Sequence, residues 1–297
     1  MKRILICGGC GYIGSELFCD LCKDHDVTSV DLEWFGRTVD NICLDYDDLT
    51  ENFLNNFDVV ILTAAHSSVG MCKKDPIGSL DNNVMRWLKL TKKLNKQKFI
   101  YASSSCVYDS VYGATEFSPT KATDDLSLTK ITIDSYTQFS NFNVEYYGLR
   151  FGSVNGPSKN FRNDLMINRM SLDSQNKTIN LANSHCHRPI LAMSDLVSAV
   201  RKIVESNEDK RGLYNIASFN ESIGNIANQV SAEFDSQINL ISNTPSTFDF
   251  TMSSEKFSQA FNWEPSIKCT KDLVNDIKLS LSTFKLIGGR ECQGGLK

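Results

Sequence analysis

The chain has 297 residues, enough for one large domain or two closely associated ones. With 41% hydrophobic and 22% charged residues it has ordinary globular composition, which excludes collagen, coiled-coil and disordered chains. The net charge is −4, so the chain lacks the excess of basic residues that nucleic-acid binding requires. No apolar run reaches the ~18 residues of a membrane span, and Met1–Ile6 leads into glycines without a secretory cleavage pattern. We therefore expect a cytoplasmic protein.

Two pairs of cysteines have the spacing of metal ligands, Cys7 with Cys10 and Cys19 with Cys22. We interpret them instead as small buried hydrophobic side chains, because Cys7 ends an apolar run, Cys10 lies in a glycine turn and the second pair lies on a helix. A redox pair is disfavoured, since the first thiol of that motif usually opens a helix. The sequence predicts reduced thiols and no metal site.

Apolar runs alternate with amphipathic stretches as far as residue 151, which predicts βαβ units. The fold class that follows is α/β, with a doubly wound parallel sheet of the Rossmann type. The predicted strands are Arg3–Cys7, Val27–Leu32, Ile42–Leu44, Val59–Thr63, Phe99–Ala102 and Val144–Phe151, and the predicted helices are Tyr12–Lys23, a long one marked by Leu80, Val84, Trp87 and Thr91, and Leu126–Phe139.

Beyond Phe151 the pattern loosens. A helix over Leu165–Leu172, a strand over Leu213–Ala217 and a helix over Phe257–Trp263 are the clearest predictions there. We assign residues 1–155 to a dinucleotide-binding domain, with return segments at about 190–217. Residues 156–189 and 218–285 then form a smaller C-terminal substrate-binding lobe, and 286–297 a flexible tail.

Three glycines follow the first strand and open a helix, at Gly8, Gly11 and Gly14. Glycines at this spacing let a pyrophosphate approach the backbone, and the helix N-terminus supplies N–H donors. Asp31 ends the second strand, where a carboxylate accepts hydrogen bonds from the adenosine ribose and repels a 2′-phosphate. The sequence therefore favours NAD over NADP, although Arg37 nearby could accommodate a phosphate.

Further motifs make the chain similar to a known family. The segment 7–14 resembles T-G-x-x-G-x-x-G, with Cys7 for the threonine. The segments 62–66, 103–108, 149–157 and 187–196 resemble L-A-A, S-S-x-x-V-Y, L-R-x-x-x-V-x-G-P and R-x-x-x-x-x-x-D-L blocks. From about residue 2 to about 280 the chain resembles the extended short-chain dehydrogenase/reductases, in their nucleotide-sugar epimerase/dehydratase branch.

The resemblance implies NAD as cofactor and a nucleotide-diphosphate sugar as substrate. It assigns the active hydroxyl to Ser104, with Ser105 beside it, and the catalytic lysine to Lys130. In the family an arginine at the position of Arg188 grips the nucleotide diphosphate, which suits a two-pronged guanidinium. The implied cofactor-binding residues are Gly8, Gly11, Tyr12, Ile13, Gly14, Asp31, Leu32, Asp45, Tyr46, Ala64, Ala65, His66, Asn83 and Lys130. The implied substrate-binding residues are His66, Ser104, Ser153, Arg162, Asn168 and Arg188.

The sequence departs from the family at the catalytic tyrosine. The family has Y-x-x-x-K, but the residue four before Lys130 is Leu126, and 120–133 contains no tyrosine. Losing a general acid/base typically costs about 10²–10⁴-fold in rate. Either another group carries the proton, with Ser104, Ser105, His66, Tyr112, Glu116 and water as candidates, or the protein binds its ligands with little or no turnover.

Our interpretation is an NAD-dependent oxidoreductase or epimerase that acts on a nucleotide sugar at C4 and serves polysaccharide biosynthesis. The alternative is a catalytically silent binding protein with a sensor or assembly role. A dehydratase is disfavoured, because the acidic pair that such enzymes carry after the active hydroxyl is Ser105 and Cys106 here. By analogy with the family we expect a homodimer, paired through helices at about 79–96 and 126–140.

Overall fold

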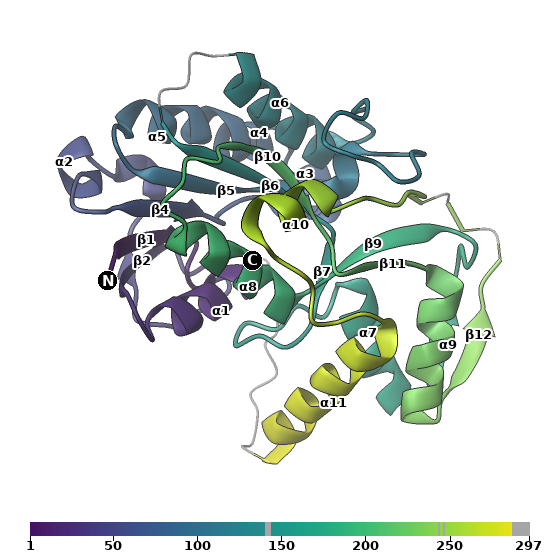
Figure 1. Cartoon of the computed structure of the whole chain (residues 1–297). Coiled ribbons are helices and arrows are strands. Elements are labelled where there is room, and N and C mark those ends of the chain that lie inside the picture. The colour runs from purple at the N-terminus through teal and green to yellow at the C-terminus, as the bar shows by residue number, and fades with distance from the viewer. Residues whose placement is uncertain (140–143, 243, 246, 287–297) are drawn as a thin grey trace.

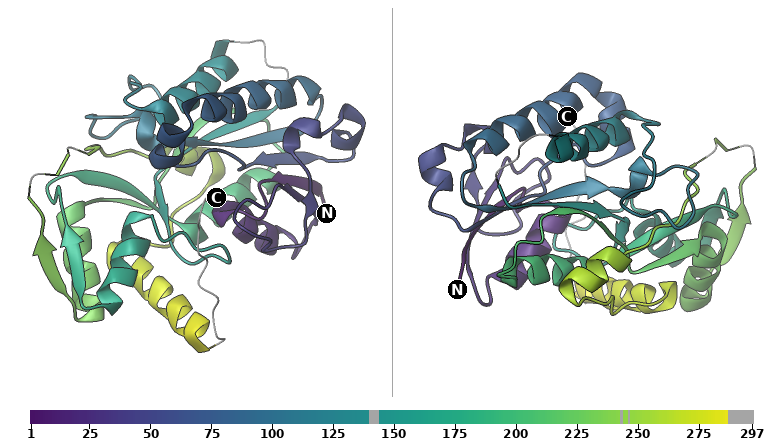
Figure 2. Two further views of the ribbon diagram at one scale, coloured as in Figure 1. Left: turned by 180° about the vertical axis from the view of Figure 1, so that it is seen from behind. Right: turned by 45° about the horizontal axis from the view of Figure 1, so that its top comes forward.

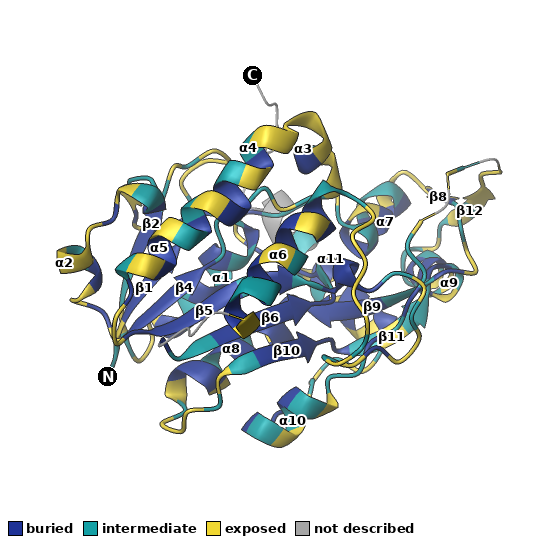
Figure 3. Cartoon of the chain, turned by 90° about the horizontal axis from the view of Figure 1, so that it is seen from above, coloured by how far each residue is buried: buried dark blue, intermediate teal, exposed yellow. Residues whose placement is uncertain are grey.

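The computed structural model describes residues 1–139, 144–242, 244–245 and 247–286. Its centre is a seven-stranded sheet with the order β10-β6-β5-β4-β1-β2-β3, in which every neighbouring pair is parallel. The central strands are buried on both faces, as their continuous apolar runs predict (Figure 3). The strands are β1 (Arg3–Cys7), β2 (Asp26–Asp31), β3 (Ile42–Cys43), β4 (Val59–Leu62), β5 (Lys98–Ser104), β6 (Tyr146–Phe151) and β10 (Gly212–Ile216).

Helices cover both faces of this sheet (Figure 1). One core packs α1 (Tyr12–Leu21), α8 (Met193–Glu205) and α10 (Glu255–Phe261) on one face. A second core packs α5 (Trp87–Lys93) and α6 (Asp125–Phe139) on the other. The remaining helices of this part are η1 (Tyr46–Asp48), α2 (Glu51–Leu54), α3 (Val69–Lys74), α4 (Pro76–Leu80), η2 (Asp81–Arg86) and η3 (Ser105–Val107). The predicted doubly wound α/β fold is confirmed.

A smaller group of elements lies beside the carboxyl ends of the strands (Figure 2). It contains a three-stranded sheet, a two-stranded sheet and three helices around a separate apolar core. Its elements are β7 (Ser153–Asn155), α7 (Met166–Gln175), β8 (Thr178–Leu181), β9 (His187–Ala192), β11 (Phe219–Ser222), α9 (Ile223–Phe234), β12 (Gln237–Leu240) and α11 (Thr270–Leu286). The tail predicted for 286–297 lies outside the described residues from 287 onward.

The long helix predicted around residues 80–91 is not a single α-helix. It is built from α4, a π-helical segment at η2 and α5. A π-helical turn holds one residue more than an α-helical turn and so shifts the apolar spacing by one position: Leu80 is 42% exposed, whereas Val84 and Trp87 are buried.

The interpretation of all four paired cysteines as buried is wrong for the second pair. Cys7 and Cys10 are buried, but Cys19 is half-buried and Cys22 is exposed. The helix α1 ends at Leu21, so Cys22 lies beyond it. Within the described ranges no cluster of His, Cys, Asp or Glu could hold a metal ion, and no helix there is long and apolar enough to cross a membrane.

A buried ion pair joins β6 to α6. The Arg150 Nε atom lies 2.7 Å from Asp134 Oδ2, and both side chains are almost completely buried. The same carboxylate accepts hydrogen bonds from Ser103 Oγ at 3.0 Å and Tyr101 OH at 3.2 Å. Asp134 follows Lys130 by one helical turn, so this network fixes the position of α6 against β5.

Candidate active site

The glycine loop between β1 and α1 has the geometry of an anion cradle. Gly8 has φ of +93°, and a Cβ atom there would lie 2.4 Å from the Ala64 nitrogen. A Cβ atom on Gly14 would lie 2.0 Å from the Gly8 carbonyl oxygen. The first turn of α1 has no side-chain cap at Gly11. Its N–H groups are therefore available to a phosphate.

Gly8→Ala should cost more than about 1–2 kcal/mol of unfolding free energy, because an L-residue is strained at this φ and its Cβ would displace Ala64. NAD affinity should fall at least about tenfold as the loop shifts. Denaturant unfolding and calorimetric titration measure the two effects. Gly70→Ala on α3, whose Cβ would meet nothing closer than 3.9 Å, is the matched control and should lower neither stability nor NAD affinity.

Asp31 lies at the end of β2, directly beside this loop. Its carboxylate accepts the Cys10 N–H at 3.0 Å and the Glu33 N–H at 2.6 Å. Burial raises the pKa of this carboxyl group, while the two backbone hydrogen bonds lower it. Arg37, the residue that could have accepted a 2′-phosphate, is bound to Asp40 at 3.0 Å. The arrangement fits an unphosphorylated ribose.

The end of β4 continues the groove through Ala64, Ala65 and His66. Asn83 holds this segment, because its Oδ1 accepts the His66 N–H at 2.8 Å and its Nδ2 donates to the His66 carbonyl at 3.1 Å. Asn82 Nδ2 lies 3.2 Å from His66 Nδ1. Burial lowers the pKa of His66, which favours the neutral ring.

Asn82 was missed in the sequence because neighbouring residues of an α-helix do not face the same side. The π-helical segment η2 brings Asn82 and Asn83 to His66 together. Tyr46 is fixed by this turn as well, since its hydroxyl donates to the Asn82 carbonyl at 2.5 Å. The only feature of the sequence that could have indicated the role of Asn82 is the pair of adjacent asparagines.

Asp45, expected near the adenine, is ion-paired with Arg86. Arg86 also contacts Asp81 at 2.7 Å. The sequence did not indicate this pair, because Asp45 and Arg86 are 41 residues apart. Leu32, the residue after Asp31, has an exposed side chain.

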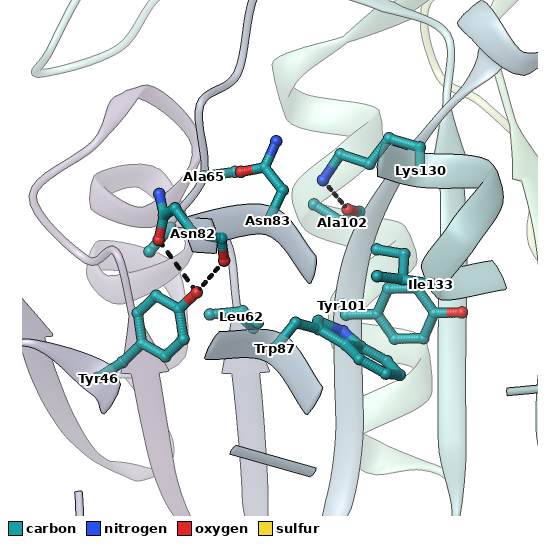
Figure 4. A pocket seen from close by; sticks show the side chains of 11 residues that line it. Tyr46, Leu62, Ala65, Asn82, Asn83, Trp87, Tyr101, Ala102, Lys130 and Ile133 are labelled. Carbon is teal, nitrogen blue, oxygen red and sulfur yellow. Dashed lines mark hydrogen bonds between the residues drawn. The ribbon is translucent and has the colours of Figure 1, made fainter. Parts of the chain in front are cut away.

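Lys130 enters the groove from α6, and Figure 4 shows its ammonium group beside the end of β5. The Nζ atom donates to the Ala102 carbonyl at 2.7 Å. Ala64, Ala65 and Asn83 line the same pocket. Burial lowers the pKa of Lys130, and no carboxylate among the described residues forms an ion pair with it. This leaves ammonium N–H groups free for a bound hydroxyl group.

Ser104 is the last residue of β5, and its hydroxyl accepts the Cys106 N–H at 3.2 Å. Its side chain is half-buried, whereas Ser105 is buried. Of the two predicted catalytic serines, Ser104 is thus the more accessible.

Leu126, the residue at which the resemblance expects a tyrosine, has an entirely apolar neighbourhood of thiols and one aromatic ring. It is buried in the first turn of α6 and packs with Cys72 and Cys106, and Phe248 covers this cluster. Burial raises the pKa of the Cys106 thiol to about 12. A thiol with that pKa is a weak acid at neutral pH.

Two of the alternative proton carriers are engaged by other groups. The Tyr112 hydroxyl donates to Asp249 at 2.5 Å, and the Glu116 carboxylate accepts the Asn215 N–H at 2.7 Å. Ser104 and His66 remain at the groove.

Arg188 lies on β9 against the aromatic rings of Phe248 and Phe250, at 5.7 and 5.9 Å. Its guanidinium donates to Thr247 Oγ1 at 2.6 Å, and no ion pair to it exists within the described part of the chain. Burial lowers the pKa of Arg188, but guanidinium groups stay charged in proteins. Phe248 also packs against the cluster of Leu126, which lies one helical turn before Lys130 on α6.

The other predicted substrate residues differ from Arg188. Arg162 is ion-paired with Asp164 and donates to Ser67 Oγ at 3.2 Å. Asn168 is completely buried, where it accepts the Gly156 N–H at 2.9 Å and donates to the Tyr12 hydroxyl at 3.3 Å. It therefore joins α7 to the cofactor side. Ser153 is half-buried at the start of β7.

The protein-family model described as "NAD dependent epimerase/dehydratase family" matches residues 4–217. Protein CapI of Staphylococcus aureus is 31% identical over 237 residues, which cover 68% of this chain and 69% of CapI. The chain belongs to the NAD-dependent epimerase/dehydratase family. A UDP-glucose 4-epimerase of Lactobacillus helveticus is 28% identical over 174 residues. That match spans about half of each chain, 52% of this one and 53% of the relative.

Solved structures of epimerases share the fold of this family member. UDP-glucuronic acid 4-epimerase from Bacillus cereus, in complex with UDP-glucuronic acid and NAD, has a TM-score of 0.82 and 20% identity, covering 95% of this chain and 99% of that one. UDP-glucose 4-epimerase from Thermotoga maritima has a TM-score of 0.83 and 18% identity, covering 94% and 99%.

NAD is the cofactor of this NAD-dependent epimerase/dehydratase family member. The residues present fit it: the glycine cradle leaves no space for a Cβ atom at Gly8 or Gly14, the helix above it is uncapped, and Asp31 borders the ribose position. The prediction of NAD from the glycine loop is confirmed.

Proposed function

We propose that this protein binds a nucleotide-diphosphate sugar beside NAD and transfers hydride at C4 of the sugar, as a slow 4-epimerase. The observation that carries the proposal is Arg188: its guanidinium forms no ion pair among the described residues, and its neighbour Phe248 packs against Leu126, one helical turn before Lys130. The names of the relatives support the substrate class, since two of them are UDP-glucose 4-epimerases.

Each group has a distinct task in this proposal. Bound NAD supplies a hydride acceptor. Ser104 donates or accepts a hydrogen bond at the sugar oxygen, with Ser105 shaping the turn behind it. Lys130 holds the ribose hydroxyls of the nicotinamide side, and Arg188 holds the diphosphate. His66, Ser153 and Arg162 border the sugar, and Asn168 keeps Tyr12 in position.

Arg188→Met should raise the Kd for a UDP-sugar by about 10–100-fold, since a hydrogen bond to a charged group contributes about 1.5–3 kcal/mol. NAD affinity should not change. Calorimetric titration with UDP-glucose and with NAD separates the two. Arg169→Met, which removes an exposed arginine paired with Asp173 on α7, is the control. Equal UDP-sugar binding by both variants would contradict the role of Arg188.

The missing tyrosine makes slow turnover the expected behaviour. Water and the Ser104 hydroxyl are two candidates to move the proton that the tyrosine moves in the family, and neither has a pKa matched to neutral pH. His66 is a further candidate because its ring lies at the groove.

The experiment that tests the function uses NAD-loaded protein with UDP-glucose or UDP-glucuronic acid. Product is measured by chromatography of the sugar nucleotides after long incubation. A C4 epimer formed more slowly than by a tyrosine-containing relative is expected. No binding of any UDP-sugar, with NAD bound, would refute the substrate half of the proposal.

The alternative function, a silent sensor of NAD and nucleotide sugar, is favoured by the apolar packing around Leu126. It predicts binding of both ligands without an epimer or released NADH. The same incubation distinguishes the two functions.

We also propose a homodimer paired through α5 and α6, and a cytoplasmic location. An apolar groove between these helices is lined by Val84, Leu88, Thr132, Ile133, Tyr136 and Phe139. The outer surface of α4 to α6 is visible in Figure 3, and the Phe139 side chain is 86% exposed. A second copy would cover this groove.

Leu88→Asp combined with Phe139→Asp should convert the dimer to a monomer, because two charges would be buried in the interface. Light scattering after size-exclusion chromatography measures the mass. Phe117→Asp, at a 90% exposed phenylalanine outside α5 and α6, should leave the mass unchanged. A wild-type monomer would refute the dimer.

A further inference from the structure

A ring contact joins the turn after β2 to the segment after β4. Trp34 follows β2 by three residues, and His66 follows β4 by four. Their ring centroids are 5.6 Å apart, with the planes at 76°. In the sheet β1 lies between β2 and β4, so the contact passes across the carboxyl end of β1. The glycine loop begins at that end.

The Trp34 turn is held in place on both sides. Asp31 Oδ1 accepts the Glu33 N–H at 2.6 Å, and Glu33 adopts a left-handed φ of 58°. On the other side Asn160 Nδ2 donates to the Cys10 carbonyl at 2.8 Å and reaches the Phe35 carbonyl at 3.4 Å. The turn is therefore fastened to the glycine loop that it faces.

His66 is held as firmly from the opposite side. Its backbone is fixed by Asn83, its Nδ1 atom lies beside Asn82, and its Nε2 atom lies 3.9 Å from Asp75. The ring thus offers Trp34 a fixed surface.

A dinucleotide in this fold runs from the ribose site at Asp31 to the pocket of Lys130, and its diphosphate crosses the glycine loop. The Trp34–His66 pair spans that same path. We propose that Trp34 is a cofactor-contacting residue, whose indole, supported by His66, covers the diphosphate of bound NAD and slows its release. This inference rests on the cofactor half of the proposed function and is independent of the sugar chemistry.

Tryptophan fluorescence reports on this site alone. The chain has three tryptophans, of which Trp87 and Trp263 are 1% and 2% exposed, whereas Trp34 is 56% exposed. Quenching by acrylamide in the wild type therefore reads out Trp34. Saturating NAD should protect it from the quencher.

Trp34→Ala should raise the Kd for NAD about tenfold, since ring contacts contribute about 0.5–1.5 kcal/mol beyond the area they bury. Most of the change should appear as faster release in stopped-flow displacement. Phe35→Ala removes a neighbouring exposed ring from the same turn and should leave Kd near the wild-type value. Trp34→Phe should recover part of the affinity.

Three results would overturn the inference. If Trp34→Ala binds NAD as tightly as the wild type does, Trp34 does not contact the cofactor. If it binds NAD more tightly, the indole obstructs the cofactor site. Equal losses in Trp34→Ala and Phe35→Ala show only a disturbed turn. A folded wild type that binds no NAD by calorimetry would instead overturn the cofactor assignment of this site, and this inference with it.

Discussion

An increase in turnover of about 10²–10⁴-fold is the expected result of Leu126→Tyr. Leu126 lies in the first turn of α6, four residues before Lys130. A phenol there would be close to a buried ammonium group, which lowers the pKa of a tyrosine. The variant would therefore supply the acid/base group that Leu126 cannot. The measurement is the rate of C4 epimer formation from UDP-glucose or UDP-glucuronic acid by NAD-loaded protein.

Leu126→Phe is the matched control, because it adds the ring without the hydroxyl group. We expect it to stay at the wild-type rate and to keep NAD affinity, since the ring would pack with Cys72, Cys106 and Phe248. If both variants remained at the wild-type rate while binding both ligands, the missing phenol would not be what limits turnover. That result would favour the silent sensor.

Asp134→Ala should lower the free energy of unfolding by about 3–5 kcal/mol. The change leaves Arg150 buried without its carboxylate, and removes the acceptor of Ser103 and Tyr101. Urea denaturation at neutral pH measures the loss. Since the network joins β5 and β6 to α6, Lys130 would also be displaced, and NAD affinity should fall with stability.

The control is an exposed ion pair of similar chemistry. Asp173→Ala on α7 breaks a pair with Arg169 and should cost only about 0.3–0.5 kcal/mol. The double variant Asp134→Leu/Arg150→Met should recover part of the loss, because replacing a whole buried pair with apolar groups is often neutral. A cost for Asp134→Ala no larger than that of Asp173→Ala would show that the network does not stabilise this junction.

The large sheet could be predicted because its strands are buried on both faces and read as apolar runs. Arg3–Cys7 has the same bounds in the sequence prediction and in β1. The strands near the C-terminus are short and partly exposed, so β11 and β12 carry no such signal. Their pairing with β9 and β8 is fixed by contacts between residues far apart in the chain.

The candidate site also has parts that the sequence predicts and parts that it does not. The glycines and Asp31 act through local backbone geometry, which a short motif encodes. The aromatic support of Arg188 comes from residues about 60 positions later, and the partner of Trp34 lies beyond another strand. Such contacts form only when segments far apart in the sequence meet in the folded protein, so no local sequence pattern predicts them.

The π-helical turn at Asp81–Arg86 holds one residue more than an α-helical turn of the same rise. Removing one residue from it would restore a regular α-helical turn of the same rise, so the residues that follow would keep their orientation. Trp87, which is 1% exposed between Phe99 and Tyr101, would therefore stay in the core. A single-codon deletion here would thus spare the packing of the sheet and act on the pocket, because only one of the two asparagines would then face His66.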